Sequence, residues 1–158
     1  MMAKRRPKDI GTAAETAVAR WLQNNGWPHA ERRALRGSHD AGDITGTPGI
    51  CWEVKAGQAA ANASDGTIQN WLTQAAIEGT VTEADISVLI QRRRGKASPA
   101  DWWAWISIAE LVDLADRTMT HDLHLSYIGG IACRLRLEHF TTIARQAGYG
   151  DALEEAAK

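Results

Sequence analysis

The chain has 158 residues, of which 44% are hydrophobic and 23% charged, and its formal net charge is −1 at pH 7. This composition is ordinary for a globular protein and excludes a disordered or fibrous chain. A chain of this length can bury a sizeable core, so we expect one domain spanning residues 1–158. Two cysteines are too few for a disulfide framework or a four-cysteine metal site. No apolar stretch approaches the roughly 18 residues of a membrane span, so we expect a cytoplasmic protein with no membrane segment.

Positive charge is concentrated in two parts of the chain. Residues 1–36 contain eight Lys or Arg and three Asp or Glu residues, and residues 92–96 contain four basic residues. A phosphate-binding surface needs local rather than global positive charge. The same pattern is also typical of a solvated surface, so charge alone leaves both interpretations open.

The predicted elements begin after a flexible basic arm of residues 1–8. Thr12 and Glu15 have the spacing of a capping box, which predicts the start of a helix that ends near Gly26. Ser107 and Glu110 repeat this spacing and predict the start of a later helix. Two more helices are predicted over 67–78 and 138–147, and strands over 30–35, 43–45, 50–55, 86–91, 102–106 and 135–137. The remaining segments, which include 56–66 and 92–99, are predicted loops.

This order of elements predicts an α/β fold with a central mixed β-sheet flanked by helices. The nearly continuous apolar run at 86–91 is typical of a strand that is buried on both faces. Residues 107–158 form a helical and strand addition at the C-terminal end. We find no internal repeat and no second domain.

The residues that suggest chemistry lie on and just before the strand over 50–55. Side chains alternate along a strand, so the apolar residues of this segment share one face while Glu53 and Lys55 share the other. A hairpin-like turn separates the strand from Asp43, which can therefore lie beside Glu53. Two carboxylates at an open edge suit Mg²⁺, a hard cation that takes oxygen ligands. Lys55 can then position or deprotonate the attacking water, or stabilise charge on a phosphate.

Each of these residues also has a structural interpretation. Asp43 can simply close a turn, and Glu53 with Lys55 can form the solvated face of an edge strand. Glu15 either caps a helix together with Thr12, or reaches over the sheet toward a bound ion. The sequence leaves these alternatives open.

Four segments together resemble the PD-(D/E)XK nuclease superfamily. They are Glu15 on the first helix, Asp43, Glu53-Val54-Lys55, and the helix that contains Trp71-Leu72-Thr73-Gln74. Within the superfamily the chain is similar to Holliday-junction-resolvase-like endonucleases, including versions common in bacteriophages. The resemblance covers about residues 8–106 and implies a restriction-endonuclease-like core in the order α-β-β-β-α-β. The chain departs from the family name in that Gly42, not proline, precedes Asp43. Asp40 is a rival to Asp43 as the first carboxylate that binds the metal.

The resemblance implies a role for each matching residue. Asp43 and Glu53 would bind the metal with the carbonyl of Val54, Glu15 would touch the metal through water, and Lys55 would be the catalytic lysine. Gln74 matches a glutamine that some relatives carry, and Ser38 matches a loop serine near the scissile phosphate. The basic residues expected to hold the DNA backbone are Arg32, Arg33, Arg36, Arg93 and Arg94.

The implied activity is Mg²⁺-dependent hydrolysis of phosphodiester bonds in DNA, with Mn²⁺ able to substitute. The expected substrate is a four-way junction or other branched DNA, in a bacterial or phage-infected cell. A four-way junction is two-fold symmetric and needs two cuts, so we expect a homodimer. The alternatives are a restriction- or repair-type nuclease that acts on duplex or flap DNA, and a non-catalytic nucleic-acid-binding protein with the same fold.

Overall fold

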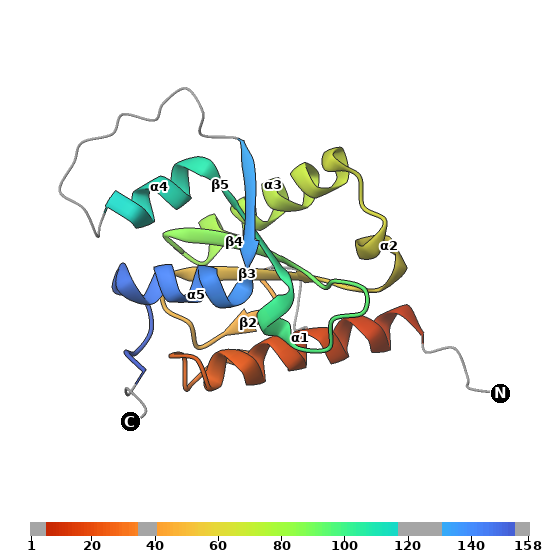
Figure 1. Cartoon of the computed structure of the whole chain (residues 1–158), viewed down its shortest axis with the longest axis horizontal. Helices are drawn as coiled ribbons and strands as arrows, with labels where there is room; N and C mark the ends of the chain where they lie inside the picture. The colour runs from red at the N-terminus through yellow and green to blue at the C-terminus, as the bar shows by residue number, and fades with distance from the viewer. Residues whose placement is uncertain (1–5, 35–40, 117–130, 154–158) are drawn as a thin grey trace.

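The computed structural model describes residues 6–34, 41–116 and 131–153 (Figure 1). Its centre is a four-stranded sheet in the order β3-β4-β5-β6. The strands are β3 (Ile50–Lys55), β4 (Ile86–Gln91), β5 (Trp103–Ser107) and β6 (Ala132–Arg136). The β3–β4 pair is parallel and the other two pairs are antiparallel, so the sheet is mixed. The predicted α/β class with a mixed sheet flanked by helices is confirmed.

The remaining elements are helices and a short two-stranded ribbon. The helices are α1 (Pro7–Gln23), α2 (Gly57–Ala61), α3 (Asp65–Val81), α4 (Ile108–Asp116) and α5 (Leu137–Gln146), with a 3₁₀ turn η1 (Pro99–Asp101). The ribbon pairs β1 (Glu31–Arg32) with β2 (Ile44–Thr45) in antiparallel register. Within the described ranges, no helix is long and apolar enough to cross a membrane.

Two apolar clusters hold the layers together, one on each face of the sheet. Trp52 is fully buried in the larger cluster, where its ring meets those of Trp27 and Phe140 edge-on at centroid distances of 6.1 and 5.7 Å. This cluster joins α1 and α5 to the sheet. The smaller cluster packs Ile68 and Leu72 of α3 against Leu89. Figure 1 shows α1 and α3 on opposite sides of β3, so the side chains of β3 alternate between the two layers as predicted.

The capping box predicted at Thr12 and Glu15 is wrong. Helix α1 begins at Pro7, and its N-cap residue Arg6 makes no capping bond through its side chain. Proline is favoured at the first helical position, because its φ is already helical and its missing N–H is not needed there. The predicted arm is therefore shorter than residues 1–8, and residues 1–5 lie outside the described residues. Glu15 falls in the middle of α1, where its carboxylate is free from any capping role.

Several other boundaries differ from the predictions. Among the described residues 30–34 of the first predicted strand, only two are paired in β1, and the loop predicted over 56–66 contains α2. Helix α3 is capped by Ser64, whose Oγ accepts from the N–H of Thr67 at 3.2 Å, and it continues past Gly79 instead of stopping there. A Cβ at Gly79 would lie 2.1 Å from the Oγ of Ser87. Gly79 therefore permits close packing of α3 on β4 and is not a stop signal.

The capping box at the start of α4 is confirmed. The N–H of Glu110 donates to the Oγ of Ser107 at 3.2 Å, and the N–H of Ser107 donates to the carboxylate of Glu110 at 3.3 Å. Two of the N–H groups that a helix start leaves without intrahelical partners are satisfied in this way.

Candidate active site

A close crossing of the chain over β3 positions Asp43. Gly42 has φ +77°, and a Cβ there would lie 2.8 Å from the Sγ of Cys51 and 2.9 Å from the carbonyl oxygen of Trp52. Only glycine fits both the conformation and the space. The N–H of Asp43 then donates to the Trp52 carbonyl at 2.7 Å, and its Oδ2 accepts from the N–H of Val54 at 2.7 Å. The Asp43 carboxylate is thus fixed at the outer edge of β3, next to Glu53.

Glu53 and Lys55 project from β3 toward α3. The Glu53 residue is only 6% exposed, and its Oε1 forms an ion pair with the Nζ of Lys55. The same Nζ lies 5.8 Å from the ring centroid of Trp71 on α3. The Lys55 side chain keeps 26% of its surface exposed, so solvent reaches the site at this end. Although β3 is the edge strand of the sheet, the two charged groups therefore lie under α3 and do not form a solvated face.

Burial, together with several neighbouring carboxylates, determines the electrostatics of the site. Burial, the charge of Glu53 and the charge of Glu15 raise the pKa of Asp43 to about 7, against the opposing effects of the Val54 N–H and Lys55. Burial lowers the pKa of Lys55, but its hydrogen bond to Glu53 and the surrounding negative charge outweigh burial and raise it above the ordinary value. The arrangement disfavours a further negative charge and favours a cation.

Glu15 faces this group of charges from α1. Its charge contributes to the raised pKa of Asp43, and its Oε2 lies 3.4 Å from Nη1 of Arg32. Of the two interpretations of Glu15, the structure therefore supports the one in which its carboxylate faces the sheet. Arg32, which the sequence assigns to DNA binding, is engaged by Glu15.

The other basic residues predicted to hold DNA fall into separate places. The N–H of Arg33 donates to the carbonyl of Asp43 at 2.7 Å, and its half-buried guanidinium is close enough to lower the pKa of Cys51. Arg94 donates to Oε1 of Gln58 at 3.0 Å, and Arg93 stacks on Trp103. Arg93 and Arg94 thus lie in the loop after β4.

Gln74 is not brought into the group. It is exposed on α3, three residues after Trp71, and within the described residues it makes no hydrogen bond to the acids or to Lys55. Ser38, Arg36 and the rival acid Asp40 lie outside the described residues.

Glu78, a buried acid on α3, is not among the residues predicted from the sequence. Glu78 is 2% exposed, and its charge raises the pKa of both Lys55 and Cys51. Burial is the largest cause of the rise at Cys51, whose pKa reaches about 11, so this thiol remains protonated at neutral pH. The available signal is the helical period: Glu78 follows Trp71 by seven residues, or two turns, and so shares its face.

The oxygen ligands available here fit a hard cation that takes few of its ligands from the protein and the rest from water. Among the described residues, no group of three or more His, Cys, Asp or Glu side chains is arranged to hold a metal ion. A cation here would be held by the carboxylates of Asp43 and Glu53, by a backbone carbonyl and by water. The N–H and C=O of one strand residue point to the same edge, so the Val54 carbonyl lies on the Asp43 side of β3. Mg²⁺ binds through one or two carboxylates and keeps several waters, which matches this set.

Comparison of the chain with protein-family models, with curated proteins and with solved structures finds no match. Function is therefore inferred from the residues of the site and their geometry.

Proposed function

We propose that the protein is a Mg²⁺-dependent endonuclease of the PD-(D/E)XK type that hydrolyses phosphodiester bonds in branched DNA. The observation that carries the proposal is the hydrogen bond from the Val54 N–H to Asp43, which sets this carboxylate beside the Glu53–Lys55 ion pair. The order α1, β1, β2, β3, α3, β4, interrupted only by the short α2, supports a core of the restriction-endonuclease-like type. Mn²⁺ is expected to replace Mg²⁺, since both are bound by oxygen ligands.

The residues of the chain have separate roles in the proposed reaction. A bound Mg²⁺ would supply a water of lowered pKa and would neutralise charge on the phosphate. Asp43 and Glu53 would hold the ion, and the Val54 N–H favours the ionised form of Asp43 that an ion requires. Glu15, whose charge also acts on Asp43, would orient a water bound to the ion. Lys55 is anchored between Glu53 and the Trp71 ring, where its ammonium stabilises the negative charge that develops on the phosphate oxygens.

The four-way junction is the leading substrate within this class. It has two-fold symmetry and needs two cuts, which a homodimer with one site in each copy would supply. Contacts to the DNA backbone are expected mainly from Arg93 and Arg94, since Arg32 forms an ion pair with Glu15. These contacts are insensitive to sequence and weaken as salt increases.

The test is cleavage of a four-way junction, a flap and a linear duplex of matched sequence in Mg²⁺. We expect the junction to be cut fastest, and Glu53→Gln to lower the rate about 100-fold or more while the protein still binds the junction. Asp151→Asn is the matched control, because this exposed acid lies away from the site and its N–H, not its side chain, contacts Gly26.

Each other outcome selects a different conclusion. Cleavage by Glu53→Gln at the wild-type rate would refute the site. Equal cutting of linear duplex would favour a restriction- or repair-type nuclease, and binding without any cleavage would favour a non-catalytic binding protein.

A further inference from the structure

The sheet face that carries Glu53 and Lys55 continues across all four strands. Residues that pair in adjacent strands point to the same face. The register gives one row from Glu53 through Leu89 and Trp105 to Arg134, and a second row from Lys55 through Gln91 and Trp103 to Arg136. Helix α3 packs over the first part of this face, where Leu89 and one side of the half-buried Trp105 join its apolar cluster. The part on β5 and β6 carries tryptophan and arginine in place of a typical apolar or acidic surface.

Three of these side chains, together with Arg93 from the loop after β4, form a stack that we name the arginine–tryptophan ladder: Arg93, Trp103, Arg134 and Trp105. The guanidinium of Arg93 lies 4.0 Å from the ring centroid of Trp103, and that of Arg134 lies 4.4 Å from Trp103 and 5.4 Å from Trp105. Arg134 is exposed, and none of the described acids forms an ion pair with it. Its exposed guanidinium can be reached by an anionic ligand.

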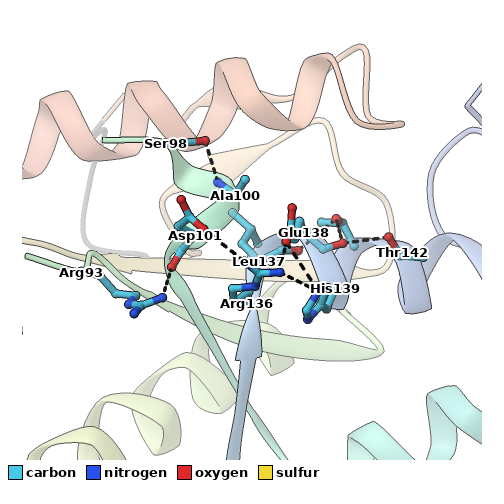
Figure 2. A network of polar contacts seen from close by, with 10 residues as sticks. Arg93, Ser98, Ala100, Asp101, Arg136, Leu137, Glu138, His139 and Thr142 are labelled. Carbon is cyan, nitrogen blue, oxygen red and sulfur yellow. Dashed lines mark hydrogen bonds and ion pairs between the residues drawn. The ribbon is translucent and has the colours of Figure 1, made fainter. Parts of the chain in front are cut away.

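The ladder is held in place before any ligand binds. Figure 2 shows Arg93 directed at the 3₁₀ turn, where its Nη1 donates to the carbonyl of Asp101 at 2.9 Å. The carboxylate of Asp101 in turn pairs with Arg136 at 3.3 Å. At the other end, Nε1 of Trp105 donates to Oε1 of Gln91 at 2.8 Å, which fixes the indole ring. These side chains therefore lose little conformational entropy when a ligand binds, which favours affinity.

A basic hollow adjoins the ladder at Arg93. The hollow has a volume of about 540 Å³ and is lined by Ile10, Gly57, Gln58, Ala61 and residues 92–97. Four of its lining residues are cations and none is acidic: Arg92, Arg93, Arg94 and Lys96. Such a concentration of one sign of charge in a concave surface attracts anions, phosphates above all.

We propose that the hollow and the ladder together bind a single-stranded segment of DNA, with its phosphates in the hollow and its unpaired bases stacked on the ladder. Flat aromatic and guanidinium planes stack on bases that are not already stacked in a duplex. The inference rests on the proposed nuclease function and narrows its substrate class. The preferred branched DNA exposes unpaired bases at its branch point, as the centre of an opened four-way junction does.

The test measures binding without cleavage. Fluorescence anisotropy in EDTA compares an oligothymidylate of about 12 nucleotides with an abasic oligonucleotide of the same length and charge. We expect wild-type protein to bind the oligothymidylate at least about ten-fold more tightly, because only this probe has bases to stack.

Two variants and a control assign this preference to the ladder. Arg134→Lys keeps the charge but removes the planar guanidinium, and Trp103→Leu removes the central ring. Each is expected to lower the ratio of the two affinities at least about five-fold, whereas Arg20→Ala, which removes an exposed charge from α1, leaves the ratio unchanged. Circular dichroism melting checks the fold of each variant, and Arg134→Lys, at an exposed position, carries the test if Trp103→Leu does not fold.

The outcomes separate this inference from the nuclease proposal. A ratio near one in the wild type, or an unchanged ratio in folded Arg134→Lys, overturns the ladder even if Glu53→Gln abolishes cleavage. A high ratio that Arg134→Lys lowers supports the ladder, and if wild-type protein then cuts no DNA in Mg²⁺, only the nuclease proposal fails.

Discussion

Replacing Asp43 by asparagine is expected to stabilise the metal-free protein above neutral pH. Burial and the charges of Glu53 and Glu15 raise the pKa of Asp43 from 3.8 to about 7. Between these two values the native state holds a proton that the unfolded state has released, so the free energy of unfolding falls as pH rises through this window. Asparagine carries no charge, and its side-chain oxygen can still accept the hydrogen bond from the Val54 N–H.

The size of the effect follows from the two pKa values. Each pH unit between them changes the free energy of unfolding by about 1.4 kcal/mol. From about pH 5 to pH 8, Asp43→Asn should therefore gain about 2 to 3 kcal/mol relative to the wild type, somewhat less if solvent screens the site.

Urea denaturation in EDTA at both pH values measures this difference. Asp151→Asn, which removes an exposed acid, should show almost no change between the two pH values. The reasoning is refuted if Asp43→Asn is less stable than the wild type at pH 8, or if the difference between the two proteins is the same at both pH values.

Substitutions at three further positions test separate parts of the structure. Gly42→Ala should lower the free energy of unfolding by at least about 2 kcal/mol in urea denaturation, because it adds a strained φ and two contacts below 3 Å, and a neutral result would contradict the close crossing of β3. Lys55→Met should lower the single-turnover rate of junction cleavage about 100-fold or more without loss of the circular dichroism spectrum, and a rate near that of the wild type would exclude Lys55 from catalysis. Ser107→Ala should cost about 1 kcal/mol in thermal denaturation and Ser107→Thr much less, since only the first removes the cap of α4, and equal losses would argue against the capping box.

The elements that the sequence predicts well are those whose signal is local. Strands β3 and β4 have the predicted bounds, because β3 alternates apolar with other side chains after Gly49, and β4 is a nearly continuous apolar run between Asp85 and Arg92. The α4 capping box is predicted because both of its residues belong to one turn of chain. At α1 the same spacing misleads, since Pro7 starts the helix earlier than Thr12.

The site is predictable only in part, because its geometry depends on contacts between distant segments. The proximity of Asp43 to Glu53 follows from strand alternation and one turn. The need for glycine at position 42 becomes clear only from the structure, because there Cys51 lies too close to leave room for a Cβ. The burial of Glu78 and the pairing of Arg32 with Glu15 depend on how α3 and α1 pack on the sheet, which no local pattern specifies.

The most direct test of the proposed site is a crystal soaked in Mn²⁺ and measured for anomalous scattering. We expect an anomalous peak in contact with the carboxylates of Asp43 and Glu53 and with the carbonyl of Val54, and no such peak in crystals of Glu53→Gln. A saturating soak that leaves this position empty, or two carboxylates that point away from each other, would contradict the assignment of a metal-dependent nuclease.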